Sequence, residues 1–315
     1  MYGLAIHGGA GTLPRSETGG DRELKYRAGL AAALDAGFSV LEAGGTSLDG
    51  VMRAVMTLED DPQFNAGLGS VFTADGRNEL DAAIMEGSTL KAGAVCGVTH
   101  VRNPVSLARA VMEHSDYVFL SGAGAEEFAL NRGFTLVPRS YFFTPQRWRQ
   151  LERIRAGDAG VSALTISHVG TVGAVALDRG GRLAAATSTG GMTGKRYGRI
   201  GDSALIGAGT YADDRSCAVS ATGHGEIFIR AAVAHDICSR MRFGGLGLGE
   251  AVNEVVHGEL AALGGEGGVI AIDRRGGIAM EFNSEGMFRA SRRAGEEPVI
   301  GIYRDAAPGS PQSPR

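Results

Sequence analysis

Residues 166–178 read ISHVGTVGAVALD and place a Gly170-Thr171 pair directly before an apolar run that is typical of a buried strand. A threonine at this point becomes a catalytic N-terminus if the chain cuts itself before it. The threonine hydroxyl alone is a weak nucleophile, but a freed α-amine on the same residue, with a reference pKa of ~7.7–8.0, can act as its base. The dipeptide alone also fits an ordinary strand start, so the rest of the chain must decide.

The composition of the 315-residue chain is ordinary for a globular protein, with 43% apolar and 21% charged residues. Its 50 glycines are about twice the usual share and indicate many tight turns and close backbone approaches. The formal net charge of −4 gives no electrostatic reason to expect a nucleic acid as partner. The one basic cluster, RWRQLERIR at 147–155, is interpreted as an exposed helical face or a linker.

The sequence predicts neither a membrane protein nor a disulfide-rich one. No apolar run is long enough to span a bilayer, and residues 1–7 lack the features of a signal peptide. Cys96, Cys217 and Cys238 are odd in number and lack the CxxC spacing. We therefore expect buried thiols in a reducing cytoplasm.

The patterning predicts an α+β protein with helices and strands in mixed order. An apolar strand over 2–6 leads into a glycine-rich turn at 7–12, and the weakly patterned segment 139–168 is interpreted as a surface linker. Short turns between strands favour antiparallel pairing. The tail 306–315 is expected to be disordered. The other expected strands cover 80–86, 92–98, 172–178, 182–187, 217–221, 268–273 and 277–282, and the expected helices cover 22–43, 47–60, 104–114, 122–132, 225–242 and 249–263.

Several common catalytic motifs are missing from the sequence. It has no GxSxG elbow, no HExxH helix and no GxGxxG turn that opens a helix. Three stretches downstream of Thr171 nevertheless contain the groups that an acyl transfer needs. TSTGG at 187–191 supplies hydroxyl groups, GRIGDS at 198–203 supplies an arginine and an aspartate, and ATGHGE at 221–226 supplies a threonine and backbone amides before a predicted helix.

Together with Thr171, these stretches resemble the plant-type L-asparaginases, also called isoaspartyl peptidases, of the N-terminal-nucleophile hydrolases. The resemblance extends upstream to AIHGGAG at 5–11, VLEAGG at 40–45 and LEDDPQFNAG at 58–67. It implies a four-layer αββα sandwich in one domain that spans residues 1–305. It also suggests a homodimer of αβ units.

The resemblance implies that the chain cuts itself between Gly170 and Thr171, giving an α chain (1–170) and a β chain (171–315). The Thr171 hydroxyl would attack the Gly170 carbonyl, and water would open the resulting ester. Glycine suits the position before the cut because it tolerates a strained backbone. The mature Thr171 would then attack the side-chain amide of L-asparagine or the isopeptide carbonyl of a β-aspartyl dipeptide, and its own amine would move the proton.

The resemblance also gives roles to the residues around the nucleophile. Thr222 and Gly223 would hold the oxyanion, as positioned donors do in acyl transfer. Arg199 would bind the substrate α-carboxylate through two parallel hydrogen bonds, and Asp202 would pair with the α-ammonium. Thr189 would hydrogen-bond the nucleophile.

The loop after the second predicted helix has two expected roles. Asn65 in this loop matches a family residue that approaches the nucleophile from the α chain. The family often holds a structural sodium ion through backbone carbonyls of this loop, and carbonyl oxygens suit such a cation. No catalytic cofactor is implied. The corresponding residues here are Leu58, Glu59, Phe64, Ala66 and Leu68.

Three other functions stay open at this point. A glycosylasparaginase-like enzyme belongs to the same superfamily, but it should be secreted and carry disulfides. A threonine hydrolase that cuts protein chains usually has a longer insertion before its nucleophile. An uncleaved binding homologue would give one intact band on a denaturing gel, whereas the hydrolase would give two fragments.

Overall fold

The computed structural model describes residues 1–11, 19–157 and 170–304, which form an α+β fold around two β-sheets. The strands of these residues are β1 (Gly3–Gly11), β2 (Leu80–Glu86), β3 (Ala92–Val98), β4 (Phe119–Ser121), β5 (Val172–Leu177), β6 (Leu183–Thr189), β7 (Thr210–Ala212), β8 (Cys217–Gly223), β9 (Gly267–Asp273), β10 (Ile278–Phe282), β11 (Gly286–Arg293) and β12 (Val299–Tyr303).

The helices are distributed over both halves of the described chain. Short 3₁₀ turns span Gly67–Gly69 and Arg139–Phe142, and a π-helical turn spans Glu254–Glu259. The α-helices are α2 (Asp21–Glu42), α3 (Ser47–Glu59), α4 (Pro104–His114), α5 (Gly122–Asn131), α6 (Pro145–Ala156), α8 (Gly225–Arg230), α9 (Val233–Arg242), α10 (Leu248–Asn253) and α11 (Leu260–Ala262).

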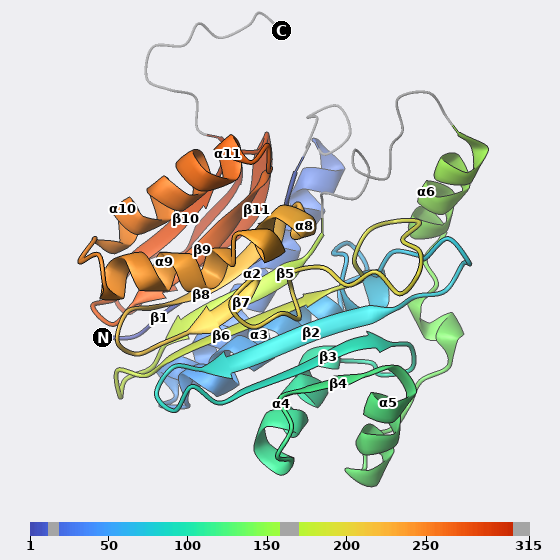
Figure 1. Cartoon of the computed structure of the whole chain (residues 1–315), viewed down its shortest axis with the longest axis horizontal. Helices are drawn as coiled ribbons and strands as arrows, with labels where there is room; N and C mark the ends of the chain where they lie inside the picture. The colour runs from blue at the N-terminus through green and yellow to red at the C-terminus, as the bar shows by residue number, and fades with distance from the viewer. Residues whose placement is uncertain (12–18, 158–169, 305–315) are drawn as a thin grey trace, which may run out of the picture.

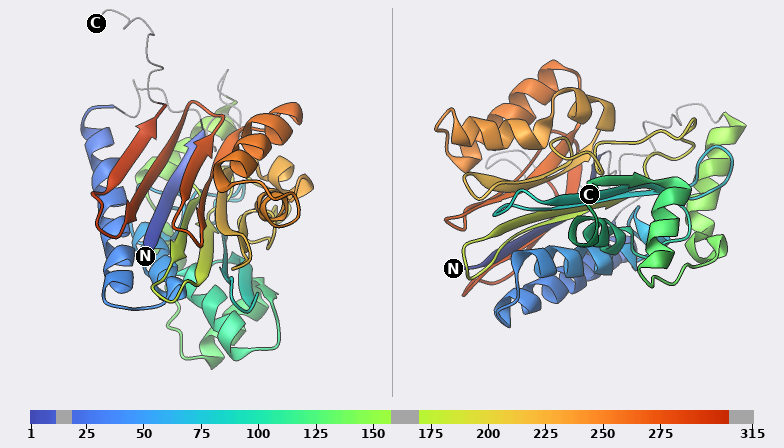
Figure 2. Two further views of the ribbon diagram at one scale, coloured as in Figure 1. Left: turned by 90° about the vertical axis from the view of Figure 1, so that its left-hand side faces the viewer. Right: turned by 60° about the horizontal axis from the view of Figure 1, so that its bottom comes forward.

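The two sheets lie face to face, and helices cover their outer faces (Figure 1). The larger sheet has the order β12-β11-β1-β5-β6-β2-β3-β4, and the smaller sheet has the order β10-β9-β8-β7. Helices α2 and α3 pack on the larger sheet, whereas α9 and α10 pack on the smaller one. Figure 2 shows these two helical groups, blue and orange, on opposite sides of the sheets.

The central strands β1, β5 and β6 are buried along their whole length, because a helical layer covers one face and the second sheet covers the other. Alternate side chains of β5 therefore enter two different cores. Val172, Ala174 and Ala176 pack toward α2 and α3, whereas Val175 and Leu177 pack between the sheets. This double burial explains why the sequence of β5 is a continuous apolar run.

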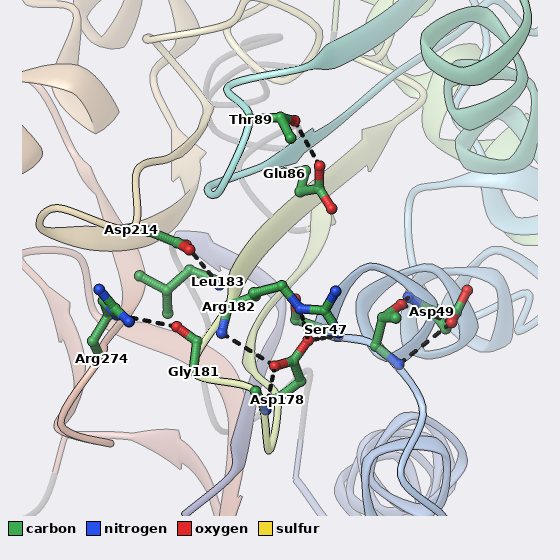
Figure 3. Close-up of polar contacts among 12 residues, drawn as sticks. Ser47, Asp49, Glu86, Thr89, Asp178, Gly181, Arg182, Leu183, Asp214 and Arg274 are labelled. Atoms are coloured by element: carbon green, nitrogen blue, oxygen red, sulfur yellow. Dashed lines mark hydrogen bonds and ion pairs between the residues drawn. The ribbon is translucent and has the colours of Figure 1, made fainter.

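The turn between β5 and β6 fixes the start of α3 (Figure 3). The buried carboxylate of Asp178 accepts hydrogen bonds from the backbone N–H of Ser47 at 3.1 Å and from the backbone N–H groups of Gly180 and Arg182 at 2.8 and 3.1 Å. Thr46 and Asp49 add a capping box at the same helix end. Helix α3 is thus held against the strand pair that carries the Gly170-Thr171 junction.

Most of the predicted elements are confirmed. The strands at 80–86 and 92–98 and the helix at 104–114 have the predicted bounds. The predicted turn at 7–12 is wrong for residues 7–11, where β1 continues to Gly11 after a bulge between His7 and Gly9. The sheets are also not wholly antiparallel, because β4 pairs with β3 in parallel.

The predicted helices at 225–242 and 249–263 are each interrupted. The first breaks between α8 and α9, where Ala232 adopts a left-handed backbone with φ of 47°. The second contains the π-helical turn between α10 and α11. Four strands had no prediction: β4, β7, β11 and β12.

The segment 139–168, predicted as a linker, differs from the expectation in its first part. It contains helix α6, which begins after a Thr144 cap and ends at Gly157 in a left-handed conformation. The guanidinium of Arg147 is buried, not exposed, and donates to the carbonyls of Gly69 at 2.8 Å and Gln63 at 3.0 Å. Residues 158–169 and the predicted disordered tail 306–315 lie outside the described residues.

The sequence predicted no membrane-spanning segment and three buried thiols. Among the residues described, none of the helices combines the length and apolar character needed to cross a membrane. Cys96, Cys217 and Cys238 are buried free thiols.

We expect Asp178→Ala to lower the free energy of unfolding by about 2–4 kcal/mol, because it leaves the buried N–H of Ser47 and the partly buried N–H groups of Gly180 and Arg182 without their acceptor. Urea unfolding followed by circular dichroism would measure the change. Asp75→Ala is the matched control, since the Asp75 side chain is 76% exposed in its pair with Arg77. Equal effects of the two substitutions would contradict the capping role of Asp178.

Candidate active site

The hydroxyl groups of Thr171 and Thr189 meet at the ends of two paired strands. Val172 pairs with Ser188 in the β5–β6 ladder, so Thr171 and Thr189 extend the same register by one residue. The Thr171 Oγ1 donates to Thr189 Oγ1 at 3.0 Å, and Thr189 Oγ1 also accepts from the Gly191 N–H at 3.0 Å. The predicted contact between Thr189 and the candidate nucleophile is therefore present.

The backbone before Thr171 is closely packed. Gly170 has a φ of 149°, a conformation that L side chains rarely adopt, and a Cβ added there would collide with Asn65. A Cβ added at Gly9 on β1 would collide with the Gly170 backbone. The peptide before Thr171 is thus held between two other backbone segments, in a conformation that favours glycine.

Asn65 orders the loop beside this junction. Its buried side chain donates to the Gly191 carbonyl at 2.8 Å and accepts from the Val71 N–H at 2.9 Å. Its backbone carbonyl accepts from the Gly190 N–H at 3.0 Å. Asn65 therefore joins its own loop to the turn after Thr189, and its Cβ faces Gly170.

Thr222 and Gly223 end β8 close to the same junction. The Thr222 Oγ1 accepts from the Ala10 N–H at 3.3 Å, and Ala10 directly follows Gly9 on β1. Because the oxygen accepts this bond, the hydroxyl proton of Thr222 is available for a ligand. Gly223 has a φ of 152°, and a Cβ there would collide with the carbonyl of Glu266. The Thr222 hydroxyl and the Gly223 backbone amide are thus consecutive groups beside the Gly170-Thr171 junction.

Arg199 and Asp202 converge on Gly225, two residues after Gly223. A Cβ added at Gly225 would lie 2.8 Å from an Arg199 guanidinium nitrogen and 3.0 Å from Asp202 Oδ1. Glycine therefore lets the start of α8 lie close to both a cation and an anion. The pairing of Arg199 was not predicted: its guanidinium donates to both carboxylate oxygens of Glu226, at 2.9 and 3.0 Å.

Asp202 carries a buried carboxyl group that is poorly satisfied. Within the described part of the chain, its Oδ2 atom has no hydrogen-bond partner. Burial raises the pKa of Asp202 to about 7, and the neighbouring Glu226 charge adds to this effect while the Arg199 charge opposes it. Such an oxygen is suited to receive a cationic group.

Three carbonyls of the loop predicted to hold a sodium ion lie close to glycines of the same loop. The Glu59 carbonyl points at Gly67, and the Phe64 carbonyl points, with that of Pro62, at Gly69; a Cβ at either glycine would collide with them. Glycine at 67 and 69 lets the loop pass close to these carbonyls. Two of the other predicted ligands are already engaged, because the Leu58 carbonyl accepts from Asp61 N–H and the Ala66 carbonyl accepts from Gly69 N–H.

Sequence reasoning missed two residues with direct contacts to this site. Glu226 was part of the ATGHGE stretch but had no assigned role, and only the three-dimensional arrangement pairs it with Arg199. His7 belongs to the AIHGGAG stretch, and its Nδ1 lies 3.1 Å from the Thr171 carbonyl oxygen. Its position before a glycine run was the only signal in the sequence.

The comparisons with known proteins agree with this geometry. Residues 1–302 match the protein family described as asparaginase. The isoaspartyl peptidase of Salmonella typhimurium is 53% identical over 310 residues, which cover 96% of this chain and 98% of the relative. The isoaspartyl peptidase of Escherichia coli is also 53% identical, with 96% of each chain covered.

A more distant relative shows the same similarity. The isoaspartyl peptidase/L-asparaginase of Mus musculus is 41% identical over 297 residues, which cover 93% of this chain and 88% of the relative. The chain therefore belongs to the asparaginase family, and the resemblance to plant-type L-asparaginases is confirmed.

We expect Asp202→Asn to stabilise the fold at pH 8 by about 1–3 kcal/mol. The pKa of Asp202 is raised to about 7, above the reference value of 3.8, so the folded state disfavours the charged form. The wild type therefore loses stability as the pH rises from about 4 to about 7, and the advantage of the variant disappears below pH 4. Urea unfolding at pH 4 and pH 8 measures both values.

Asp116→Asn is the control for this experiment, since Asp116 is exposed. It should change the free energy of unfolding by less than about 0.5 kcal/mol at either pH. An Asp202→Asn variant that is less stable than the wild type at pH 8 would show that the buried charge is compensated.

Proposed function

We propose that this chain is an autoproteolytically activated amidohydrolase, which converts L-asparagine to L-aspartate and ammonia and hydrolyses β-aspartyl dipeptides. The observation that carries the proposal is the Thr171–Thr189 hydroxyl pair at a glycine junction, beside a third hydroxyl from Thr222. Similarity to isoaspartyl peptidases along nearly the whole chain supports it.

The architecture is proposed to be the αββα sandwich of the N-terminal-nucleophile hydrolases, in one domain over residues 1–305. The packing of α2 and α3 on one sheet and of α9 and α10 on the other supports this assignment. The family match over residues 1–302 gives independent support.

The proposed maturation is a transfer of the Gly170 acyl group from nitrogen to oxygen. The Thr171 Oγ1 attacks the Gly170 carbonyl carbon, the C–N bond breaks, and the α-amine of Thr171 becomes free. Water then hydrolyses the ester and leaves a carboxylate on Gly170. The close packing of Gly170 against Asn65 and Gly9 supports this step, because it restricts the scissile peptide to one strained geometry.

In the mature enzyme, the Thr171 hydroxyl would attack the side-chain carbonyl of the substrate, and the Thr171 amine would take the hydroxyl proton. The Thr222 hydroxyl and the Gly223 N–H would stabilise the oxyanion, and one such donor is typically worth about 3–4 kcal/mol of barrier. The amine then protonates the leaving ammonia or amino acid. Water hydrolyses the Thr171 ester and releases L-aspartate.

The substrate class follows from Arg199 and Asp202. The guanidinium would bind the α-carboxylate, and the buried carboxylate would bind the α-ammonium, with both groups beside Gly225. A substrate therefore needs a free α-amino acid end. This requirement favours an enzyme that acts on asparagine and β-aspartyl dipeptides over a hydrolase that cuts inside protein chains. An assay with glycosylated asparagine separates the proposed function from the glycosylasparaginase alternative.

We also propose a structural sodium ion held by backbone carbonyls of the Leu58–Leu68 loop, with the Glu59 and Phe64 carbonyls as the best-placed ligands. The ion would take no part in the reaction. It would compensate the convergence of carbonyl dipoles and so fix the loop that carries Asn65.

The proposed assembly is a homodimer of αβ units in the cytoplasm. Exposed apolar side chains of Tyr117, Val118 and Phe119 lie at or next to the edge strand β4, and a second copy of the chain would cover them. The three free cysteines fit a reducing compartment.

We expect Thr171→Ala to abolish both self-cleavage and hydrolysis, since it removes the attacking oxygen from both reactions. Mass spectrometry of wild-type protein kept at neutral pH should give fragments that end at Gly170 and begin at Thr171. The variant should stay intact, and its asparaginase rate should fall by about three orders of magnitude or more. Thr171→Ser is the matched control and should keep both reactions at reduced rates. A fully active wild-type preparation with an uncut chain would refute the proposal.

Glu226→Gln should weaken substrate binding, because Glu226 holds the Arg199 guanidinium through two hydrogen bonds. We expect KM for L-asparagine to rise about 3- to 10-fold while kcat changes by less than about twofold. Glu254→Gln, which removes a carboxylate paired with Arg240, is the control. A lower KM in the Glu226 variant would show instead that Glu226 competes with the substrate for Arg199.

A further inference from the structure

A chain of four buried polar side chains crosses the interior between the two sheets and ends at Thr171. His7 on β1, Ser220 on β8, Thr187 on β6 and Thr210 on β7 are all fully buried. His7 Nε2 lies 2.9 Å from Ser220 Oγ, Ser220 Oγ lies 2.6 Å from Thr187 Oγ1, and Thr187 Oγ1 lies 2.6 Å from Thr210 Oγ1. The chain thus crosses between the larger and the smaller sheet three times.

The chemistry of the groups fixes the direction of this chain. The Thr171 carbonyl can only accept, so His7 Nδ1 must carry the proton for the contact at 3.1 Å. In a neutral imidazole Nε2 is then an acceptor, and Ser220 must donate to it. Burial lowers the pKa of His7 to about 3, which keeps the ring neutral.

The remaining two links follow from the first two. The Ser220 proton is used on His7, so Thr187 donates to Ser220, and Thr210 donates to Thr187. The competing acceptors are more distant: the Gly209 carbonyl lies 3.1 Å from Thr187, and the Ser203 carbonyl lies 3.0 Å from Thr210. All donors therefore point toward the Thr171 carbonyl, and such chains polarise one another.

Two features of the strands show that the fold makes room for this contact. The β1–β5 ladder ends at the pair His7–Gly173, so the side chain of His7 supplies a donor to the Thr171 carbonyl beyond the end of the ladder. A Cβ added at Gly173 would collide with both Ser220 Oγ and His7 Nε2. Glycine at 173 thus leaves the space in which the histidine and the serine meet.

We propose that His7 is a positioning residue for the nucleophile, and that the chain Thr210–Thr187–Ser220–His7 holds the peptide plane from which the Thr171 amine and hydroxyl project. The proposal rests on the proposed function, in which Thr171 is the attacking residue. It names a residue on the α chain that acts through the carbonyl of the catalytic residue, without contact with the substrate.

The contact matters most after the cut. Before it, Thr171 is held on its N-terminal side by the covalent bond to Gly170. After it, Thr171 is a chain end, and the described contacts that remain on its own atoms are the Thr189 hydroxyl and the His7 N–H. Loss of the His7 donor should therefore harm hydrolysis more than self-cleavage, because only hydrolysis depends on the orientation of a free terminal residue.

Two substitutions at His7 separate its two hydrogen bonds. The amide of His7→Asn can replace Nδ1 and donate to the Thr171 carbonyl, whereas the longer amide of His7→Gln reaches the position of Nε2 and Ser220. We expect His7→Gln to lower kcat for L-asparagine about 10- to 100-fold with KM within about threefold, and His7→Asn to keep kcat at least fivefold above that of His7→Gln. The rate of self-cleavage should fall less than kcat in both variants.

Controls make the result specific. His257→Gln and His257→Asn change a partly exposed histidine paired with Glu281 and should leave kcat, KM and cleavage unchanged. If the His7 variants do not fold, Ser220→Ala keeps the His7 donor to Thr171 and removes the hydroxyl group that donates to His7 Nε2, and kcat should fall about 2- to 10-fold. Equal kcat values for His7→Gln and His7→Asn, or an unchanged kcat for Ser220→Ala, would overturn the proposal.

A spectroscopic measurement tests the direction of the chain without any assay of activity. Nitrogen-15 NMR of histidine-labelled protein, with the His7 signals assigned from a His7 variant, should show a neutral ring protonated on Nδ1 between pH 5.5 and pH 8. A ring protonated on Nε2, or a charged ring in this range, would refute the proposal. If this tautomer is found but Thr171→Ala stays active, the proposed function fails and the hydrogen-bond chain stands.

Discussion

The pairing of β5 with β6 is the constraint on which the rest of the site depends. Its register places Thr171 opposite Thr189 at the end of a fully buried strand pair, where neither hydroxyl can move far from the other. Double burial by the helices and the second sheet makes this register stringent, because a shift by one residue would exchange the two cores of β5. The candidate nucleophile is therefore positioned by the packing of alanine and valine side chains.

The groups that would hold the substrate come from a different part of the fold. Thr222 and Gly223 end a strand of the smaller sheet, and Arg199 and Asp202 lie in the loop before that sheet. The strand β1 of the larger sheet connects the two groups of site residues, because its Ala10 N–H donates to Thr222 on the smaller sheet. The candidate nucleophile and its neighbouring hydroxyls are thus held by strands, while the charged groups of the candidate site are held by a loop and by the start of one helix.

Regular elements were predictable where their apolar pattern was long, as in α3 and α4, but three-residue strands such as β4 and β7 carry no pattern. Helix α6 was only one of two interpretations of residues 147–155, because few of its side chains are buried, although Thr144-Pro145 and Gly157 are ordinary start and stop signals. The family resemblance named the threonines of the candidate site and the proposed substrate-binding pair, Arg199 and Asp202. It could not predict Glu226 or His7, because their contacts join segments that are distant in sequence.

The strand order of the larger sheet has a topological consequence for a chain cut before residue 171. Strands from the two sides of that point are interleaved: β11 and β12 flank β1 on one side, and β5 with β6 separate it from β2 on the other. The two fragments could separate only if the hydrogen bonds between several pairs of neighbouring strands broke at once. The two fragments would therefore stay associated after the cut. Their interleaved sheet would form while the chain is still one molecule, and cleavage would follow folding.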